Sequence, residues 1–144
     1  MFKNILVPIH IAYSKNHEKL FKGALEVLDD DGQMTLLFTN QNRIHGSVVL
    51  DDDNQTNYDH VALDKLKEIA KKHSLPLDKV SFLVKDGIVH DEILNEAKRR
   101  KADAIVMMAT RPGLSSYFIS STAERVIRHA RCSVFVIRLE KIVS

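Results

Sequence analysis

Residues 104–138 read AIVMMATRPGLSSYFISSTAERVIRHARCSVFVIR, and this stretch decides the fold. It begins with the apolar run Ala104–Met108 and closes with the apolar run Ser133–Arg138, and both are typical of strands that are buried on two faces. Between the two runs, apolar side chains recur at helical spacing at Ala123, Val126, Ile127 and Ala130. Two buried strands joined by a helix predict a parallel pair with a helical crossover.

The same alternation extends back to the beginning of the chain. Short apolar strands are predicted over Phe2–Pro8, Met34–Thr39 and Val80–Val84. Three amphipathic helices are predicted between the strands, with apolar positions at Leu20, Phe21, Ala24, Leu25 and Leu28, then at Ala62, Leu66, Ile69 and Ala70, then at Val89, Ile93, Leu94 and Ala97. This order predicts an α/β fold in three layers, with a five-stranded parallel sheet covered by helices on both faces.

Capping and turn residues mark the ends of these elements. Ser14 is placed to cap the first helix, and Asp31-Gly32 is predicted to end it. The one long loop is predicted from Asn40 to about residue 56, because this segment is polar. Ser121 and Glu124 have the spacing of a capping box at the start of the last helix.

The composition predicts one domain over residues 1–144, because apolar residues make up 44% and charged residues 28% of an ordinary single-domain length. A net charge of +2, with acidic and basic residues interspersed, favours no nucleic-acid partner. No apolar run approaches the roughly 18 residues of a membrane span, and the first residues lack the features of a signal peptide. We therefore expect no membrane partner and a cytoplasmic location.

Metal and catalytic motifs give no support to an enzyme. The histidines lack zinc-ligand spacing, the single cysteine, Cys132, cannot anchor a Cys-rich site, and Asp51-Asp52-Asp53 lacks the glycine of a calcium loop. No nucleophile elbow, Walker loop or dinucleotide fingerprint is present. We therefore predict no metal site and no catalytic residue.

A ligand site is expected at the carboxyl ends of the strands, where the strand order of a doubly wound sheet reverses. The candidate residues are Pro8, Ile9, His10, Phe38, Thr39, Ala109, Thr110, Arg111, Ser120, Ser121 and Thr122. The helix N-terminus at the last three favours a phosphate group. His10 either donates to a ribose or phosphate or simply caps the strand end. The serines at 115, 116, 120 and 121 are candidates for phosphorylation or for capping.

Three segments of the chain carry a family resemblance. Lys3–Pro8 at the beginning, and Ser120–Ala130 with Cys132–Arg138 at the end, resemble the signature segments of universal stress proteins. The stretch Leu75–Val80, followed by Asp86-Gly87, is similar to the third-strand region of the same family. The resemblance covers essentially the whole chain and is to the short single-domain bacterial subgroup.

The resemblance implies the adenine nucleotide α-hydrolase-like fold, with strand order 3-2-1-4-5, and a homodimer joined through the last strand. The residues of that interface would be Val134, Phe135, Val136, Ile137 and Arg138. Pairing across a two-fold axis would cover an apolar edge strand.

Many universal stress proteins bind ATP through a segment G-x-x-G-x9-G-[ST] and an aspartate after the first strand. Here Met107, Thr110 and Ser120 stand at the three glycine positions, and Ser121 keeps the final hydroxyl. A gapped alignment instead pairs Ala109–Pro112 with the loop of one ATP-binding subgroup. The expected aspartate is replaced at Ile9-His10, and side chains at the glycine positions are expected to narrow the phosphate site.

The resemblance therefore implies a stress-response binding or regulatory module with a degenerate adenine-nucleotide site. Two alternatives stay open. One is a stress protein that binds ATP or AMP with slow or no hydrolysis, and the other is a dimerisation partner of other stress proteins.

Overall fold

Five parallel strands form one sheet in the computed structural model, which describes residues 2–12, 16–41, 52–109 and 119–138. The strands are β1 Phe2–Pro8, β2 Leu28–Asn40, β3 Val80–Asp86, β4 Ala104–Met108 and β5 Ser133–Ile137. Their order is β3-β2-β1-β4-β5, and each neighbouring pair is parallel, which confirms the predicted fold. The order reverses at β1, so a ligand crevice is expected at the carboxyl ends of β1 and β4.

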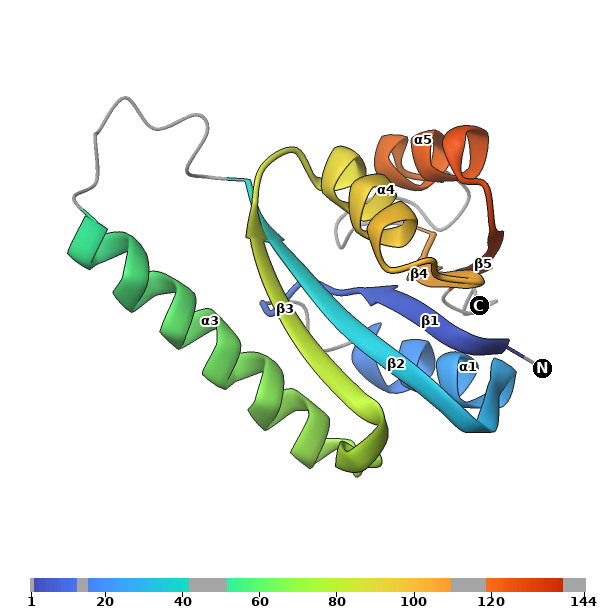
Figure 1. The fold of residues 1–144 in the computed structure, drawn as a ribbon, viewed down its shortest axis with the longest axis horizontal. Coiled ribbons are helices and arrows are strands. Elements are labelled where there is room, and N and C mark those ends of the chain that lie inside the picture. Colours follow the sequence, from blue (N-terminus) through green and yellow to red (C-terminus); the bar gives the residue numbers. More distant parts are fainter. Residues whose placement is uncertain (1, 13–15, 42–51, 110–118, 139–144) are drawn as a thin grey trace, which may run out of the picture.

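Helices cover both faces of the sheet (Figure 1). On one face lie α1 His17–Val27 and α3 Asp52–Lys72, and on the other lie α4 Val89–Arg99 and α5 Ser121–His129. Side chains of a strand alternate between the two faces, and the core divides accordingly. Ile5 and Val7 of β1 belong to the cluster under α1 and α3, whereas Leu6 belongs to the cluster under α4 and α5.

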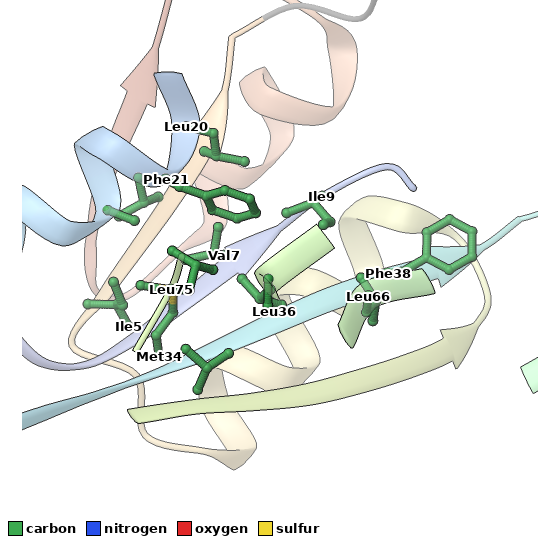
Figure 2. Packing of buried hydrophobic residues seen from close by; sticks show 14 of the residues in the cluster. Ile5, Val7, Ile9, Leu20, Phe21, Met34, Leu36, Phe38, Leu66 and Leu75 are labelled. Atoms are coloured by element: carbon green, nitrogen blue, oxygen red, sulfur yellow. The ribbon is translucent and has the colours of Figure 1, made fainter. Parts of the chain in front are cut away.

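The larger core cluster lies between the sheet and α1 and α3. Figure 2 shows Val7 and Ile9 beside Leu20 and Phe21 of α1, with Phe38 at the far end of the cluster. Burying one such side chain stabilises the fold by roughly 1.5–3 kcal/mol. Because Ile9 belongs to this cluster, the chain stays fixed to the core after β1 has ended.

The boundary between α1 and β2 differs from the prediction. The helix ends at Val27 and β2 begins at Leu28, so Asp31-Gly32 lies inside the strand and not at a helix end. Pairing with β1 jumps in register at this point, which makes the segment a bulge. A Cβ on Gly32 would lie 3.1 Å from the carbonyl oxygens of Asp29 and Phe2. The glycine therefore lies where two backbone segments approach closely within a bulge. The prediction that Asp31-Gly32 ends the first helix is wrong.

Other boundaries move by a few residues. α3 begins at Asp52, six residues before the predicted start at Tyr58, so the polar composition of this segment hid a helical turn. Asp51 and Ser14, with the loop positions 42–50, lie outside the described residues. Among the described residues, no group of three or more His, Cys, Asp or Glu side chains is placed to hold a metal ion. In the described ranges no helix has both the length and the apolarity needed to cross a bilayer.

Candidate functional site

The chain beyond β1 is held by a continued ladder with β2. Ile9 is buried, and its N–H donates to the carbonyl of Leu37 at 2.9 Å. His10 is exposed, and its Nδ1 accepts from the N–H of Ala12 at 3.1 Å. The neutral ring of His10 therefore carries its proton on Nε2. The same ring lies edge-on to Phe38, with ring centroids 5.6 Å apart.

The buried His17 forms a hydrogen bond to this segment. The sequence pattern did not indicate this role. Nε2 of His17 donates to the carbonyl of His10 at 2.9 Å, and the ring contacts those of Phe21 and His73 at centroid distances of 5.9 and 6.1 Å. Burial lowers the pKa of His17 from its ordinary value of 6.5, the carbonyl of His10 opposes this, and the nearby His73 and Lys72 lower it further. His17 is therefore neutral at pH 7.

The end of β2 holds a buried hydroxyl. Thr39 is 8% exposed, and its Oγ1 has no hydrogen-bond partner among the described residues. Leu37 belongs to the core under α4 and α5, and Thr39, two residues on, faces the same side of the sheet. Leaving such a group unpaired costs roughly 1–3 kcal/mol. A ligand that offers a hydrogen bond would remove this cost.

The chain also crosses the end of β2 on its way out of β3. Gly87 donates its N–H to the carbonyl of Asn40 at 3.2 Å, and the side chain of Asn40 is buried. β2 thus extends one residue beyond its predicted end, and Asn40 adds a polar side chain to this edge that was not among the candidates.

Backbone hydrogen bonds join the end of β4 to the start of α5. Ala109 is fully buried, and its N–H donates to the carbonyl of Ile137 at 2.8 Å. The carbonyl of Ala109 in turn accepts the N–H of Ser120 at 2.8 Å. The residue that precedes α5 is therefore fixed directly at the carboxyl edge of the sheet.

Ser120, and not Ser121, caps α5. The hydroxyl oxygen of Ser120 accepts from the N–H of Ala123 at 3.1 Å, so the predicted capping box is wrong. Glu124 is one position too late to complete such a box and instead lies 3.0 Å from Arg128 in an exposed ion pair. This arrangement leaves the N–H groups of residues 121 and 122 without an acceptor inside the helix.

The three glycine positions of the family motif have different surroundings. Met107 is buried within β4 in the core under α4 and α5. Ser120 has φ −63°, a conformation that any residue adopts, so this position does not require glycine. Thr110, together with Arg111, Ser115 and Ser116, lies outside the described residues.

The remaining candidates lie at the carboxyl edge of the sheet but do not all face the same way. Pro8 is the half-buried last residue of β1, and the ring of Phe38 belongs to the core under α1 and α3. Ser121 is exposed and Thr122 is half-buried in the first turn of α5. Among the described residues, the polar groups at this edge are thus His10, Thr39, Asn40 and the start of α5.

A doubly wound parallel sheet with a capped helix start beside the end of β4 places the chain in the class of α/β proteins in which the carboxyl edge of the sheet is the usual place for a ligand. The family model of the universal stress protein family matches residues 1–138, and the chain belongs to this family. The chain is 26% identical over 146 residues to Universal stress protein G of Escherichia coli O157:H7, covering 96% of this chain and 100% of the relative.

Solved structures of the family share the adenine nucleotide α-hydrolase-like fold. The universal stress protein UspA from Lactobacillus plantarum is 24% identical, with a TM-score of 0.69 over 94% of this chain and 97% of that one. A universal stress protein family protein from Arabidopsis thaliana, solved with AMP bound, is 18% identical, with a TM-score of 0.59 over 94% of this chain and 90% of that one. These likenesses show the fold.

Proposed function

We propose that this universal stress protein is a single-domain, non-catalytic binding module that holds an adenine nucleotide at the carboxyl edge of its sheet. The observation that supports this most is the fixed start of α5. Ser120 is tied to Ala109 at the end of β4 and caps the helix with its own hydroxyl. The cap does not use the N–H groups of Ser121 and Thr122, and these two groups can donate to one phosphate group.

The helix dipole adds to this preference for an anion. α5 has nine residues, and its N-terminus carries a partial positive charge that favours a phosphate by roughly 0.3–1 kcal/mol when exposed. Two backbone donors suit a monophosphate, whereas the glycines that the family motif supplies for a triphosphate chain are absent. AMP is therefore the proposed ligand, and AMP is also the molecule bound in the Arabidopsis relative.

Two side chains are placed to recognise the nucleoside. The buried hydroxyl of Thr39 lacks a partner among the described residues and can bond a ribose or base atom. His10 lies at the end of β1, where the family motif has an aspartate. An imidazole in place of a carboxylate removes a negative charge from this point, which suits an anionic ligand.

The proline variant Ser121→Pro tests the phosphate contact directly. Residue 121 is the first helical position, where proline is well tolerated, and Ser120 already has the extended conformation that a following proline requires (φ −63°, ψ 156°). The variant removes one N–H and leaves the helix intact. Ser121→Ala, which keeps the N–H, is the matched control.

Isothermal titration with AMP is the measurement. We expect saturable binding of AMP to the wild type and to Ser121→Ala, and about tenfold weaker binding to Ser121→Pro, as for the loss of one hydrogen bond to a charged group. Absence of AMP binding to the wild type would favour a module without nucleotide. Equal affinity for Ser121→Pro would place the phosphate elsewhere.

We further propose that two copies of the chain pair through β5. This strand lies at one end of the sheet, and Val134, Phe135, Val136 and Ile137 are only half-buried in the described structure. An apolar edge strand is a site for strand pairing, and Arg138 follows it at the same edge. Light scattering in solution measures whether the pair forms.

A further inference from the structure

A cavity lies at the edge of the sheet opposite the proposed nucleotide site. Its volume is about 310 Å³, and it lies between the last turns of α4 and α5, which pack side by side on one face (Figure 1). Ala102, which precedes β4, and Cys132, which precedes β5, form part of its wall. The cavity is therefore at the amino edge of the strands, and the start of α5 is at the carboxyl edge.

The cavity is lined by basic residues. Among the described residues that line it, none is acidic, and the basic ones are Lys98, Lys101, His129 and Arg131. All four are exposed, and none forms an ion pair with a described residue. Three of them carry a full positive charge at neutral pH.

Three arginines of the same helices that do not line the cavity form ion pairs, whereas Arg125 of α5, which also lies outside it, forms none with a described residue. Arg99 and Arg100 of α4 contact the carboxylate of Glu96 at 3.6 and 3.2 Å, and Arg128 of α5 contacts Glu124 at 3.0 Å. The carboxylates of Glu96 and Glu124 thus pair with arginines that do not line the cavity. Asp103, whose charge reaches Cys132, accepts the N–H groups of Lys3 and Asn4, and within the described part of the chain no carboxylate forms an ion pair with the basic residues that line the cavity.

Basic residues at helix C-termini also offset the helix dipole, and this accounts for only part of the charge. Each helix C-terminus amounts to about half a negative charge, so the two ends together balance about one of the three permanent cations. Two carbonyls near the end of α4, those of Ala97 and Lys98, already accept the N–H groups of Ala102 and Lys101. The helix ends therefore do not account for all of the positive charge on the residues that line the cavity.

The backbone of Lys101 supplies an independent observation. This residue follows the end of α4 with φ +54°, the left-handed conformation in which glycine or asparagine is usual. A residue with a Cβ is less stable there than glycine. The chain nevertheless has a lysine at this position, and that lysine lines the cavity.

We infer that this cavity binds a small phosphate monoester with an apolar body. A phosphate monoester carries close to two negative charges at neutral pH and so matches three unpaired cations better than a carboxylate does. Leu94, Ala97 and Ala130 provide an apolar surface for the rest of the molecule. The thiol of Cys132 adds to that surface, since burial raises its pKa and keeps it protonated.

Titration of the ¹⁵N-labelled protein with phenyl phosphate tests the site. We expect saturable shifts at the N–H groups of Asn95, Ala102 and Cys132, and at least fivefold weaker binding of benzoate. Phenyl phosphate should also slow the alkylation of Cys132, the single cysteine of the chain. Shifts confined to residues 121 and 122 would place the phosphate at the other edge and overturn the inference, as would equal binding of benzoate.

Two variants test whether phenyl phosphate binds at this cavity or responds only to the overall charge of the protein. Lys101→Gly should weaken phenyl phosphate at least fivefold while the urea midpoint stays the same or rises, because glycine suits the left-handed conformation. Arg131→Gln should weaken it to a similar extent. Lys67→Gln, an exposed change on α3 across the sheet, is the control. A loss of affinity in the control as large as in Lys101→Gly would contradict the inference, whatever the outcome of the AMP titration.

Discussion

The N–H of Ser120 donates to the carbonyl of Ala109 at 2.8 Å, so the cap of α5 is held by the residue that follows β4. The hydroxyl of Ser120 in turn accepts from Ala123 at 3.1 Å. The start of the helix is therefore positioned by the sheet, and a ligand at this point meets donors that are already in place.

Replacing this cap should destabilise the fold without moving the helix. Ser120→Ala removes the acceptor for the N–H of Ala123, and we expect a loss of about 1 kcal/mol in the free energy of unfolding. Ser120→Asp, which retains a capping oxygen, should recover most of this loss. Urea unfolding gives the measurement, and an Ser120→Ala variant as stable as the wild type would show that the hydroxyl does not cap α5.

Thr39→Val should separate stability from binding. Valine has nearly the same shape but no hydroxyl, and because Oγ1 has no partner among the described residues, we expect an increase of roughly 1 kcal/mol in unfolding free energy. Affinity for AMP should fall at the same time. Thr39→Ser, which keeps the hydroxyl, should retain AMP binding. A destabilised Thr39→Val would mean that the hydroxyl is already bonded in the unliganded protein.

The buried His17 should make stability depend on pH. Its pKa is lowered in the folded protein from 6.5, so the unfolded chain takes up the proton more readily. Stability is then complete above about pH 6.5 and decreases as the pH falls below that value.

His17→Gln removes this titration while its amide can still donate to the carbonyl of His10. We expect this variant to lose less stability than the wild type between about pH 8 and about pH 5, measured by urea unfolding. His60→Gln, at an exposed position on α3, is the control and should follow the wild type. Identical pH profiles for all three proteins would contradict the role of His17.

Proline at residue 136 should prevent pairing through β5. Since Ala109 donates to the carbonyl of Ile137, the backbone groups of Ile137 face β4, and those of Val136 face the edge away from β4. Val136→Pro therefore removes an N–H that the parallel ladder does not use. We expect monomers by light scattering, and dimers for Val136→Ala. Dimers of Val136→Pro would show that the chains meet elsewhere, whereas Phe135→Pro would also damage the ladder to β4.

The five strands could be predicted from the sequence because buried parallel strands are largely apolar, although β2 begins at Leu28 and not at the predicted Met34. Ala104–Met108 was predicted with the bounds that the structure shows. The end of α1 could not be predicted, because Asp31-Gly32 has the composition of a turn and lies in a bulge that only pairing with β1 reveals.

The candidate site could be located but not resolved in detail. Ser120 and Ser121 are equivalent as capping residues in the sequence, and the hydrogen bond to Ala109 decides between them. The unpaired hydroxyl of Thr39 depends on which side chains lie around it, and the sequence carries no such information. The left-handed backbone conformation of Lys101 could not be predicted either, because nothing in the sequence distinguishes this lysine from Lys98.

The sheet also acts as a partition between two halves of the proposed nucleotide pocket. Ile9 is held by the core under α1 and α3, whereas Met107, just before the turn at Ala109, is held by the core under α4 and α5. Damage to one core should therefore loosen one wall of the pocket and leave the other in place. Variants of the core under α1 and α3 could in this way alter the contact at His10, and variants of the core under α4 and α5 the contacts at Thr39 and at the start of α5.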